Sequence, residues 1–154
     1  MALKPIANFV SAPSPDHPGW STFAIDDPTL FNSVVMGQLL IRNESERSCR
    51  LRMFPVRHHS NVLGAIHGGM IMALADVSLF AVTRLLLAAD AAGSVTLDMS
   101  TQFIGGGRLD APLDVVTEVL RETGRLVFVR GLLEQEGQLV AAFSASIRKP
   151  TRRD

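Results

Sequence analysis

A long apolar stretch near the middle of the sequence limits the folds open to this chain more than any other feature. Residues 67–88 are rich in methionine, alanine and leucine, which favour a helix. Between residues 68 and 83 the apolar side chains occupy nearly every direction around that helix. A soluble helix of this kind has to be covered on most sides by the rest of its domain. We therefore expect it to lie at the centre of the fold.

The segments around this helix show the period-2 pattern of β-strands, separated by short turn signals. Thr123-Gly124 and Glu136-Gly137 are typical of hairpin turns. Successive hairpins imply an antiparallel sheet, so the pattern predicts an α+β fold in which an antiparallel sheet wraps around one long central helix. The strands are expected at residues 33–42, 47–56, 94–103, 113–121, 126–133 and 138–148.

The length of 154 residues suits one compact domain. Residues 1–22 are rich in proline and lack periodicity, so we expect an irregular arm, anchored by Trp20 and Phe23. A short helical turn is expected at residues 28–32. Residues 23–150 are expected to form the single domain and residues 151–154 a tail.

Composition excludes several classes of protein. The 15 basic and 15 acidic residues balance, whereas a nucleic-acid binder usually carries a basic excess. Asp76 and Arg84 interrupt the apolar stretch, which argues against a membrane span. The single cysteine, Cys49, forms no intramolecular disulfide, and this fits a reducing compartment. We expect a cytoplasmic protein that binds neither nucleic acid nor membrane.

Asp76 is the single charge between residues 68 and 83 of the predicted helix. An ionised carboxylate in apolar surroundings costs several kcal/mol unless it is paired or hydrogen-bonded. One interpretation places Asp76 on a narrow exposed stripe, or in an ion pair with Arg84. The favoured interpretation is a carboxylate held in an apolar cleft for nucleophilic or general-base chemistry.

Gly68 and Gly69 stand where the helix is expected to begin. Glycine there lets a substrate approach unsatisfied backbone N–H groups, which suit the oxygen of a polarised carbonyl. A purely structural interpretation is tight packing between loop and helix. Gly68 and Asp76 lie eight residues apart, about 12 Å along a helix axis. If both act on one substrate, they come from two chains, which predicts a dimer with two sites at its interface.

Asn61 and His67 add polar groups just before the helix. Asn61 is suited to hold a water or a carbonyl group, and His67 to donate a hydrogen bond at the helix mouth. The pair His58-His59 raises the question of a metal site, but the spacing of the 4 histidines matches no familiar metal pattern. We expect no metal.

Asn61-x-x-Gly64-x-x-His67-Gly68-Gly69 followed by Asp76 resembles the motif of the hotdog-fold acyl-CoA thioesterases of the PaaI type, in the 4-hydroxybenzoyl-CoA thioesterase-like superfamily. This resemblance implies a hotdog fold, assembly as a homodimer or a dimer of dimers, and hydrolysis of acyl-CoA at the dimer interface. It implies Asp76 as nucleophile or general base and an oxyanion-type N–H on Gly68. It also implies that Asn61 positions water or a carboxylate and that His67 hydrogen-bonds near the thioester.

Some members of this family add a hydroxyl residue from the strand after the helix, contributed by the other protomer. Thr96 is the nearest match here. Alternation along residues 94–103 predicts that Thr96 shares a face of the sheet with Asp98, opposite Val95 and Leu97. Gly64 and Gly69 are expected to lie against the substrate.

The chain departs from the family after that strand, where many relatives have a basic residue and a proline and this chain has Gly105, Gly106, Gly107 and Arg108. The glycines form either a flexible turn or a backbone cradle for a CoA phosphate with Arg108 as counter-charge.

The predicted reaction is hydrolysis of an acyl-CoA to free acid and CoA, with no cofactor beyond the CoA of the substrate. Phe31, Val34, Met36, Phe80 and Trp20 are candidates to line a pocket for a medium-chain or aryl acyl group. A hotdog enoyl-CoA hydratase or dehydratase is an alternative, although its D-x-N-P-x-H-like signature is missing. A non-catalytic acyl-CoA binding protein is another.

Overall fold

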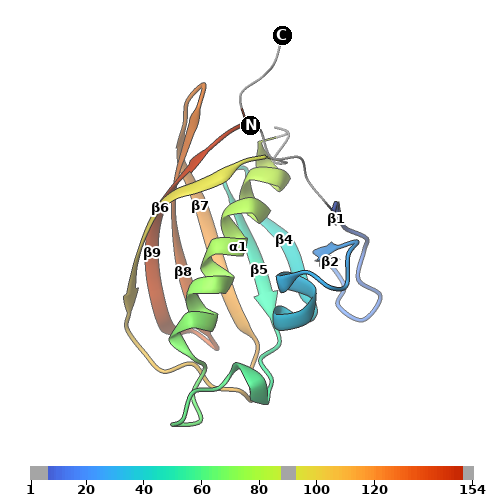
Figure 1. The fold of residues 1–154 in the computed structure, drawn as a ribbon, viewed down its shortest axis with the longest axis vertical. Coiled ribbons are helices and arrows are strands. Elements are labelled where there is room, and N and C mark those ends of the chain that lie inside the picture. Colours follow the sequence, from blue (N-terminus) through green and yellow to red (C-terminus); the bar gives the residue numbers. More distant parts are fainter. Residues whose placement is uncertain (1–6, 88–92, 151–154) are drawn as a thin grey trace.

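One long helix, α1 (Gly68–Leu86), lies against one face of a seven-stranded sheet in the computed structural model, which describes residues 7–87 and 93–150 (Figure 1). Every neighbouring pair of strands in this sheet is antiparallel. The predicted α+β architecture, a sheet wrapped around a central helix, is therefore confirmed. His67 is the N-cap of α1 rather than its first residue, and the predicted helix end at Ala88 falls outside the described residues.

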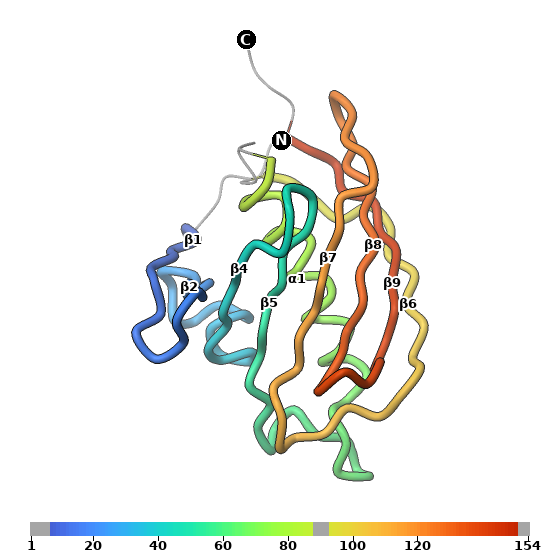
Figure 2. Tube along the Cα trace, turned by 180° about the vertical axis from the view of Figure 1, so that it is seen from behind, coloured from blue at the N-terminus to red at the C-terminus, as the bar shows by residue number. Residues whose placement is uncertain are grey.

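The strand order is β2-β4-β5-β7-β8-β9-β6, so the strand that follows α1 in the chain lies at one edge of the sheet (Figure 2). This order places β6 beside β9 alone among the strands of the described chain. The strands are β2 (Ser21–Thr22), β4 (Leu39–Ser45), β5 (Ser48–Met53), β6 (Val95–Phe103), β7 (Leu113–Glu122), β8 (Leu126–Gln135) and β9 (Gln138–Arg148).

The core lies between α1 and the inner face of the sheet. Alternate residues of each strand point toward the helix, as period-2 patterning requires. Fully buried side chains on the two sides include Leu74, Leu79 and Val82 from the helix and Leu51, Met53, Val115, Leu133 and Ile147 from the strands. Burial of this apolar area stabilises the helix in its central position.

The prediction of a strand at residues 33–42 is wrong for its first half. Residues 32–36 form a short π-helical segment, η1 (Asn32–Met36), and the strand begins only at Leu39. The Ser33 hydroxyl donates to the Asp27 carbonyl at 2.8 Å and keeps this segment coiled. Gly37, at φ 67°, then ends it. The helical turn expected at 28–32 thus occurs a few residues later. The β-branched residues after Ser33 favour a strand by their composition, but in the structure they lie within this helical segment.

The N-terminal arm is fixed to the body at two apolar anchors. Trp20 is buried on the outer face of the sheet, with the guanidinium groups of Arg42 and Arg52 each 4.5 Å from its ring. Phe23 is buried and stacks on Phe9 at 4.9 Å. Both predicted anchors are confirmed. The arm also contains order that was not predicted, since β1 (Phe9–Val10) pairs with β3 (Ala24–Ile25) and β2 joins the main sheet.

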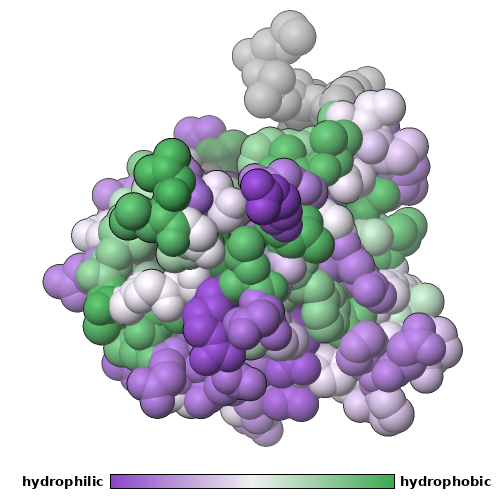
Figure 3. Space-filling view, turned by 90° about the horizontal axis from the view of Figure 1, so that it is seen from below, coloured by the Kyte–Doolittle hydropathy of each residue, from purple (hydrophilic) through white to green (hydrophobic). Residues whose placement is uncertain are grey.

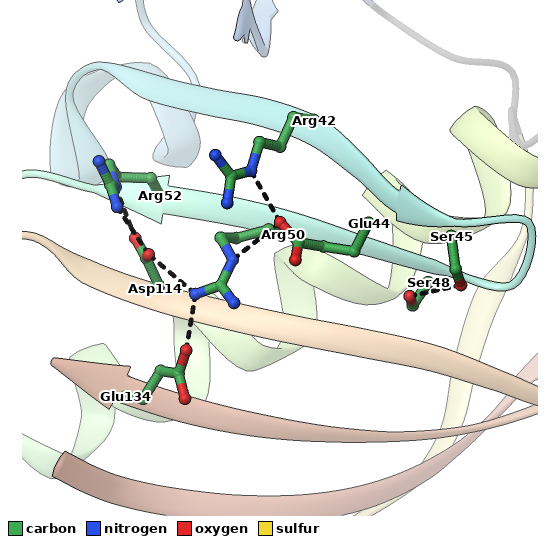
Figure 4. Close-up of polar contacts among 8 residues, drawn as sticks. All are labelled: Arg42, Glu44, Ser45, Ser48, Arg50, Arg52, Asp114 and Glu134. Atoms are coloured by element: carbon green, nitrogen blue, oxygen red, sulfur yellow. Dashed lines mark hydrogen bonds and ion pairs between the residues drawn. The ribbon is translucent and has the colours of Figure 1, made fainter. Parts of the chain in front are cut away.

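The outer face of the sheet carries a network of ion pairs (Figure 4). Arg42 and Arg52 of this network are the two arginines that lie over Trp20. Arg50 contacts Glu44, Asp114 and Glu134 at 3.0, 3.0 and 2.6 Å. Burial disfavours the charged form of Arg50, but the hydrogen bonds from Arg50 to Glu134, Glu44 and Asp114 outweigh this and raise its pKa. The charged side chains on this face thus pair with one another and point away from the helix.

By length and composition α1 is the one described helix that is apolar enough to cross a membrane. More than half of it is buried inside the molecule, and it carries Asp76 in its middle. Its apolar character is explained by its position as the core helix of the fold.

Candidate active site

His67 caps the start of α1. Its Nδ1 atom accepts a hydrogen bond from the Gly69 N–H at 2.9 Å, and its carbonyl accepts from Met70 and Ile71. With Nδ1 as acceptor, a neutral ring carries its proton on Nε2. The His67 ring is exposed, so that N–H faces solvent at the mouth of the helix. The structure thus shows His67 as a helix cap, and its role as a donor to the substrate stays a prediction.

The backbone amide of Gly68 is the first of the helix, directly after His67. No residue within 7–87 and 93–150 accepts a hydrogen bond from it. A Cβ atom at Gly68 would lie 3.3 Å from the ring of Phe103, so glycine leaves room for that ring. The Gly69 amide, by contrast, is already used by His67. Of the two glycines, Gly68 therefore has the N–H that remains available to a substrate.

Asn61 organises the loop that leads into the helix. Its Oδ1 atom accepts from the Leu63 and Ala65 amides at 2.9 and 3.2 Å, and its carbonyl accepts from Gly64 at 3.1 Å. Gly64 has φ +79°, a left-handed conformation that favours glycine. The Asn61 oxygen is thus committed to the loop, and the side-chain NH₂ is the part left to hold a water or a carbonyl oxygen.

Asp76 lies about two turns further along α1 and is half-buried. The Thr96 hydroxyl of the same chain donates to its Oδ1 atom at 2.8 Å. Oδ2 has no hydrogen-bond partner in the described parts of the chain. Arg84 does not pair with Asp76 and instead donates to the Phe9 carbonyl at 3.2 Å. Of the alternatives for Asp76, the ion pair with Arg84 is therefore wrong.

Asp76 stands on the least buried stripe of α1, which faces away from the central strands of the sheet and lies next to its edge strand β6. Its neighbours on this stripe are Gly69, Met72, Ala73 and Phe80. Met72 is 40% exposed, and Leu97 on β6 is 53% exposed. In the single chain Asp76 thus lies on a partly exposed stripe, as the other interpretation of this residue placed it, and is not enclosed in an apolar cleft.

A β-bulge at Leu97 explains how Thr96 reaches Asp76. Thr96 pairs with Ile147 on β9, and Asp98 pairs with the adjacent residue, Ser146, so that Leu97 is the extra residue. Paired residues share a face of the sheet, and Ile147 is fully buried on the inner face. Thr96 therefore points inward while Asp98 points outward. The prediction that these two share a face is wrong, because alternation assumes an unbroken register.

The predicted site residues form two groups within one chain. Asn61, Gly64, His67, Gly68 and Gly69 gather around the start of α1, and Asp76 with Thr96 lies two turns away. Eight residues of helix, about 12 Å, separate Gly68 from Asp76. No single carbonyl group spans that distance inside one protomer.

The end of the molecule at which α1 begins carries apolar patches between polar ones (Figure 3). Arg108 borders a shallow groove of about 400 Å³ there. Arg108 contacts Asp110 at 2.9 Å and Glu136 at 2.8 Å, so its charge is already partly balanced. The groove is lined by Leu63, Gly64, Ala65, Gly106, Gly107, Arg108, Leu109 and Asp110.

At two of the three consecutive glycines, glycine is required by close packing rather than by flexibility. A Cβ atom would lie 2.7 Å from the Leu139 carbonyl at Gly105 and 2.9 Å from Ile66 at Gly107. At Gly106 nothing lies within 4 Å of that position. Gly106 is thus the member with open space on the groove side.

His59 is a residue that the sequence reasoning missed. It is buried, its Nδ1 accepts from the Val56 amide at 3.0 Å, and its Nε2 donates to the Val35 carbonyl at 2.6 Å. Its own carbonyl accepts from the His67 amide at 2.8 Å. His59 thus ties η1 to the helix start. The adjacent pair His58-His59 was the available signal, but nothing local distinguishes the buried histidine from the exposed one.

Other candidate groups are set apart from this site. Cys49 is buried, and burial raises the pKa of its thiol to about 12, so it is not a nucleophile at neutral pH. In the described segments, no three His, Cys, Asp or Glu side chains are arranged to hold a metal ion. Trp20 and Met36, which were candidates to line an acyl pocket, are buried elsewhere, Trp20 between two arginines on the outer face.

A single apolar helix wrapped by an antiparallel sheet, with a carboxylate on its open side and an edge strand beside it, defines a hotdog-fold protein with a polar site on the helix. The model of the thioesterase superfamily matches residues 63–142, just over half of the sequence, and the chain belongs to that superfamily. A search of curated protein sequences finds no match.

Several solved structures share the fold. Zebrafish thioesterase superfamily member 2 is 20% identical, with a TM-score of 0.69 over 81% of this chain and 89% of its own. A hypothetical thioesterase of Streptococcus pneumoniae with coenzyme A is 20% identical, with a TM-score of 0.66 over 75% of this chain and 91% of its own. The E. coli PaaI protein is 15% identical, with a TM-score of 0.67 over 80% and 86%. These likenesses confirm the hotdog fold.

Proposed function

We propose that this chain hydrolyses acyl-CoA thioesters at two sites shared between the protomers of a homodimer. The observation that carries the proposal is the half-buried Asp76 carboxylate, oriented by Thr96 and open on its other side. Membership of the thioesterase superfamily supports the reaction class. The S. pneumoniae thioesterase was solved with coenzyme A, and also as alanine variants at an aspartate and at a threonine, which supports the choice of ligand and of residue types.

The dimer is inferred from the separation of the two groups of site residues. Antiparallel α1 helices from two chains would place Gly68 of one opposite Asp76 of the other. The surface around Asp76 suits such a contact, because Met72 and Leu97 expose apolar area beside it. β6 also pairs with β9 alone in the described sheet, and proteins generally cover or blunt such an edge. Two such dimers would give the dimer of dimers that the resemblance implies.

In the proposed mechanism, the thioester carbonyl oxygen accepts a hydrogen bond from the Gly68 N–H, with the His67 Nε2–H close by. Asp76 of the facing chain either takes a proton from an attacking water or attacks the carbonyl carbon itself, to form an anhydride that water then hydrolyses. The tetrahedral oxyanion is stabilised at the helix start. In either route this intermediate collapses by breaking the C–S bond, and CoA leaves as the thiolate. The acyl group is then released directly as the free acid when water attacks, or remains as the Asp76 anhydride until water hydrolyses it to the free acid. Thr96 leaves Oδ2 of Asp76 free for either role.

The remaining assignments concern the two ends of the substrate. The groove beside Gly64, Gly106 and Arg108 is proposed to bind part of the CoA. Arg108 would then exchange part of its contacts with Asp110 and Glu136 for contacts with the CoA. Three side chains are proposed to contact a medium-chain or aryl acyl group: Phe80 on the stripe beside Asp76, Phe31 at the N-cap of η1 and Val34 within η1. Phe31 and Val34 are 55% and 61% exposed. The reaction needs no further cofactor, and a cytoplasmic location fits acyl-CoA as substrate.

The test measures free-thiol release from short, medium, long and aryl acyl-CoAs by the native protein and by Asp76→Asn. Asp98→Asn is the matched control, since that carboxylate is exposed and points to the other face of the same sheet edge. The proposal expects turnover by the native protein and by Asp98→Asn, and a loss of at least about a hundredfold in Asp76→Asn.

Other outcomes separate the rival functions. Full activity in a folded Asp76→Asn would refute the assignment. Thermal stabilisation by acyl-CoA without thiol release would favour a binding protein, and hydration of an enoyl-CoA without thiol release would favour a hydratase.

A further inference from the structure

A buried chain of hydrogen bonds runs from β7 to α1 on the side of the helix that faces the sheet. The Thr117 hydroxyl donates to the Ser78 hydroxyl at 2.8 Å, and the Ser78 hydroxyl donates to the Ala75 carbonyl at 2.6 Å. Both hydroxyl residues have 0% of their surface exposed. The Ala75 carbonyl belongs to the same planar peptide group as the Asp76 N–H. This series of hydrogen bonds thus ends on the peptide group that joins Ala75 to Asp76.

The surroundings of this pair are apolar. Thr117 is paired in the sheet with Cys49 on one side and Gly131 on the other. Across residues 7–87 and 93–150, it makes the one hydrogen bond that joins a fully buried side chain of α1 to a side chain of the sheet. Replacement of two paired polar groups by apolar ones of the same shape is nearly neutral for stability. The hydrogen bond between Thr117 and Ser78 therefore fixes the placement of α1 on the sheet more than it stabilises the fold, since it forms in only one arrangement of helix and sheet.

We propose that Ser78 and Thr117 are positioning residues, which hold α1 at the rotation and height where Asp76 meets Thr96. Two residues of helix turn the chain by about 200°, so Ser78 and Asp76 point to nearly opposite sides of α1. Thr117 holds the helix from β7 and Thr96 from the edge strand β6, with β8 and β9 between them. A helix held at one point can still turn about it, whereas two points on different strands fix it. This inference rests on the proposed function, because it assigns the pair to the orientation of the reactive carboxylate.

The main test is the double variant Ser78→Ala/Thr117→Val, which removes both hydroxyls and leaves no partner unsatisfied. We expect its Tm to stay within about 3 °C of the native value. In its crystal structure the hydrogen bond between Thr96 and Asp76 is expected to be lost or split between rotamers. kcat is expected to fall about tenfold while KM changes by less than about twofold, because the reactive group is misplaced and the binding surfaces remain.

Two further variants separate position from stability. Thr117→Ser keeps the donor and is expected to retain the Thr96–Asp76 bond and near-native kcat, although the lost methyl group lowers its Tm. Val115→Ala removes buried volume from the same strand without touching the hydrogen bonds. It is expected to lower Tm while the Thr96–Asp76 bond and the kcat of the folded protein persist.

The crystal structures decide the inference even if no acyl-CoA is turned over, a result that would instead count against the proposed function. A Thr96–Asp76 bond of native length in the double variant would overturn the positioning role. Loss of that bond in Val115→Ala as well would also overturn it, since any weakening of the core would then suffice. Should the double variant fail to fold, Ser78→Ala alone is expected to give the same loss of the bond, and its retention there would have the same meaning.

Discussion

Thr96 and Asp76 are twenty residues apart in the sequence, and in the fold the hydroxyl of the first donates to the carboxylate of the second at 2.8 Å. The bond joins the centre of the helix to the edge of the sheet. It occupies Oδ1, and within the described chain Oδ2 stays unoccupied. This bond orients the carboxylate without neutralising it by a cation, as the role proposed for Asp76 requires.

Thr96→Val is expected to lower kcat by about tenfold to a hundredfold with little change in KM, because the carboxylate loses its orienting donor while the binding surfaces stay intact. Steady-state thiol release at several substrate concentrations separates the two constants. Thr96→Ser should retain most of the activity. Ser100→Ala, on the outer face of the same strand, serves as the control, and an equal loss there would argue against a specific role for Thr96.

Mixing two inactive variants tests whether the site is shared between protomers. Gly68→Ala is expected to be impaired because its methyl group would lie 3.3 Å from the Phe103 ring and beside the amide proposed to bind the substrate. In a heterodimer with Asp76→Asn, one site combines both substitutions and the other keeps native Gly68 and native Asp76.

Subunit exchange between these variants should therefore restore up to about one quarter of native activity, given random pairing. Sedimentation of each variant before mixing checks that both remain dimeric. No recovery after demonstrated exchange would mean that Gly68 and Asp76 do not act together across an interface.

His59→Ala is expected to destabilise the fold by about 2–4 kcal/mol, because the Val35 carbonyl and the Val56 amide lose their buried partner. Urea unfolding monitored by circular dichroism measures this. His58→Ala is the matched control, since that ring is exposed and makes only a longer 3.2 Å contact with Val35. Its expected cost is below about 1 kcal/mol. Equal effects of the two substitutions would contradict the role given to His59.

The pH dependence of stability follows from carboxyl groups with lowered pKa values. Hydrogen bonds from the Asn8 backbone and side chain lower the pKa of Asp26, and those from Thr29 lower the pKa of Asp27. At Glu44 burial acts in the opposite direction, but Arg42 and Arg50 outweigh it and lower the pKa. Such groups bind fewer protons in the folded than in the unfolded state. Their stabilisation is present above the unfolded pKa and is lost as pH falls through the folded pKa.

We therefore expect the free energy of unfolding to fall from about pH 5 downward, which urea titrations at a series of pH values will measure. Glu44→Gln should make this acid dependence shallower. Glu46→Gln, in the same hairpin between β4 and β5, changes an exposed carboxylate outside that network and is the control. A stability that stays constant down to about pH 3 would contradict the expectation.

Local patterns were sufficient for the central helix and for most strands of the main sheet, though not for residues 33–38 or for the short strands of the arm, and they singled out the polar residues of the candidate site. The apolar circumference of residues 68–83 predicts a central helix, and alternation predicts the strands, because both patterns report which side chains leave water. Asp76 stands out for the same reason, since a charge in such surroundings needs a compensating role. Helix-start glycines after a histidine likewise indicate unsatisfied amides at Gly68 and Gly69, whereas the contact of Gly69 with His67 in the structure leaves Gly68 as the free one.

Tertiary structure decided what depends on partners far away in the chain. The bulge at Leu97 exists only in the pairing of β6 with β9, and it alone turns Thr96 toward Asp76. Burial of His59 rather than His58 depends on where η1 brings the Val35 carbonyl, and Ser78 meets Thr117 only when α1 lies across β7. The sequence by itself determined which residues must be buried and with what period. Which buried or half-buried groups meet was decided by the packing of distant segments, since side-chain direction follows from register, and register is not a local property.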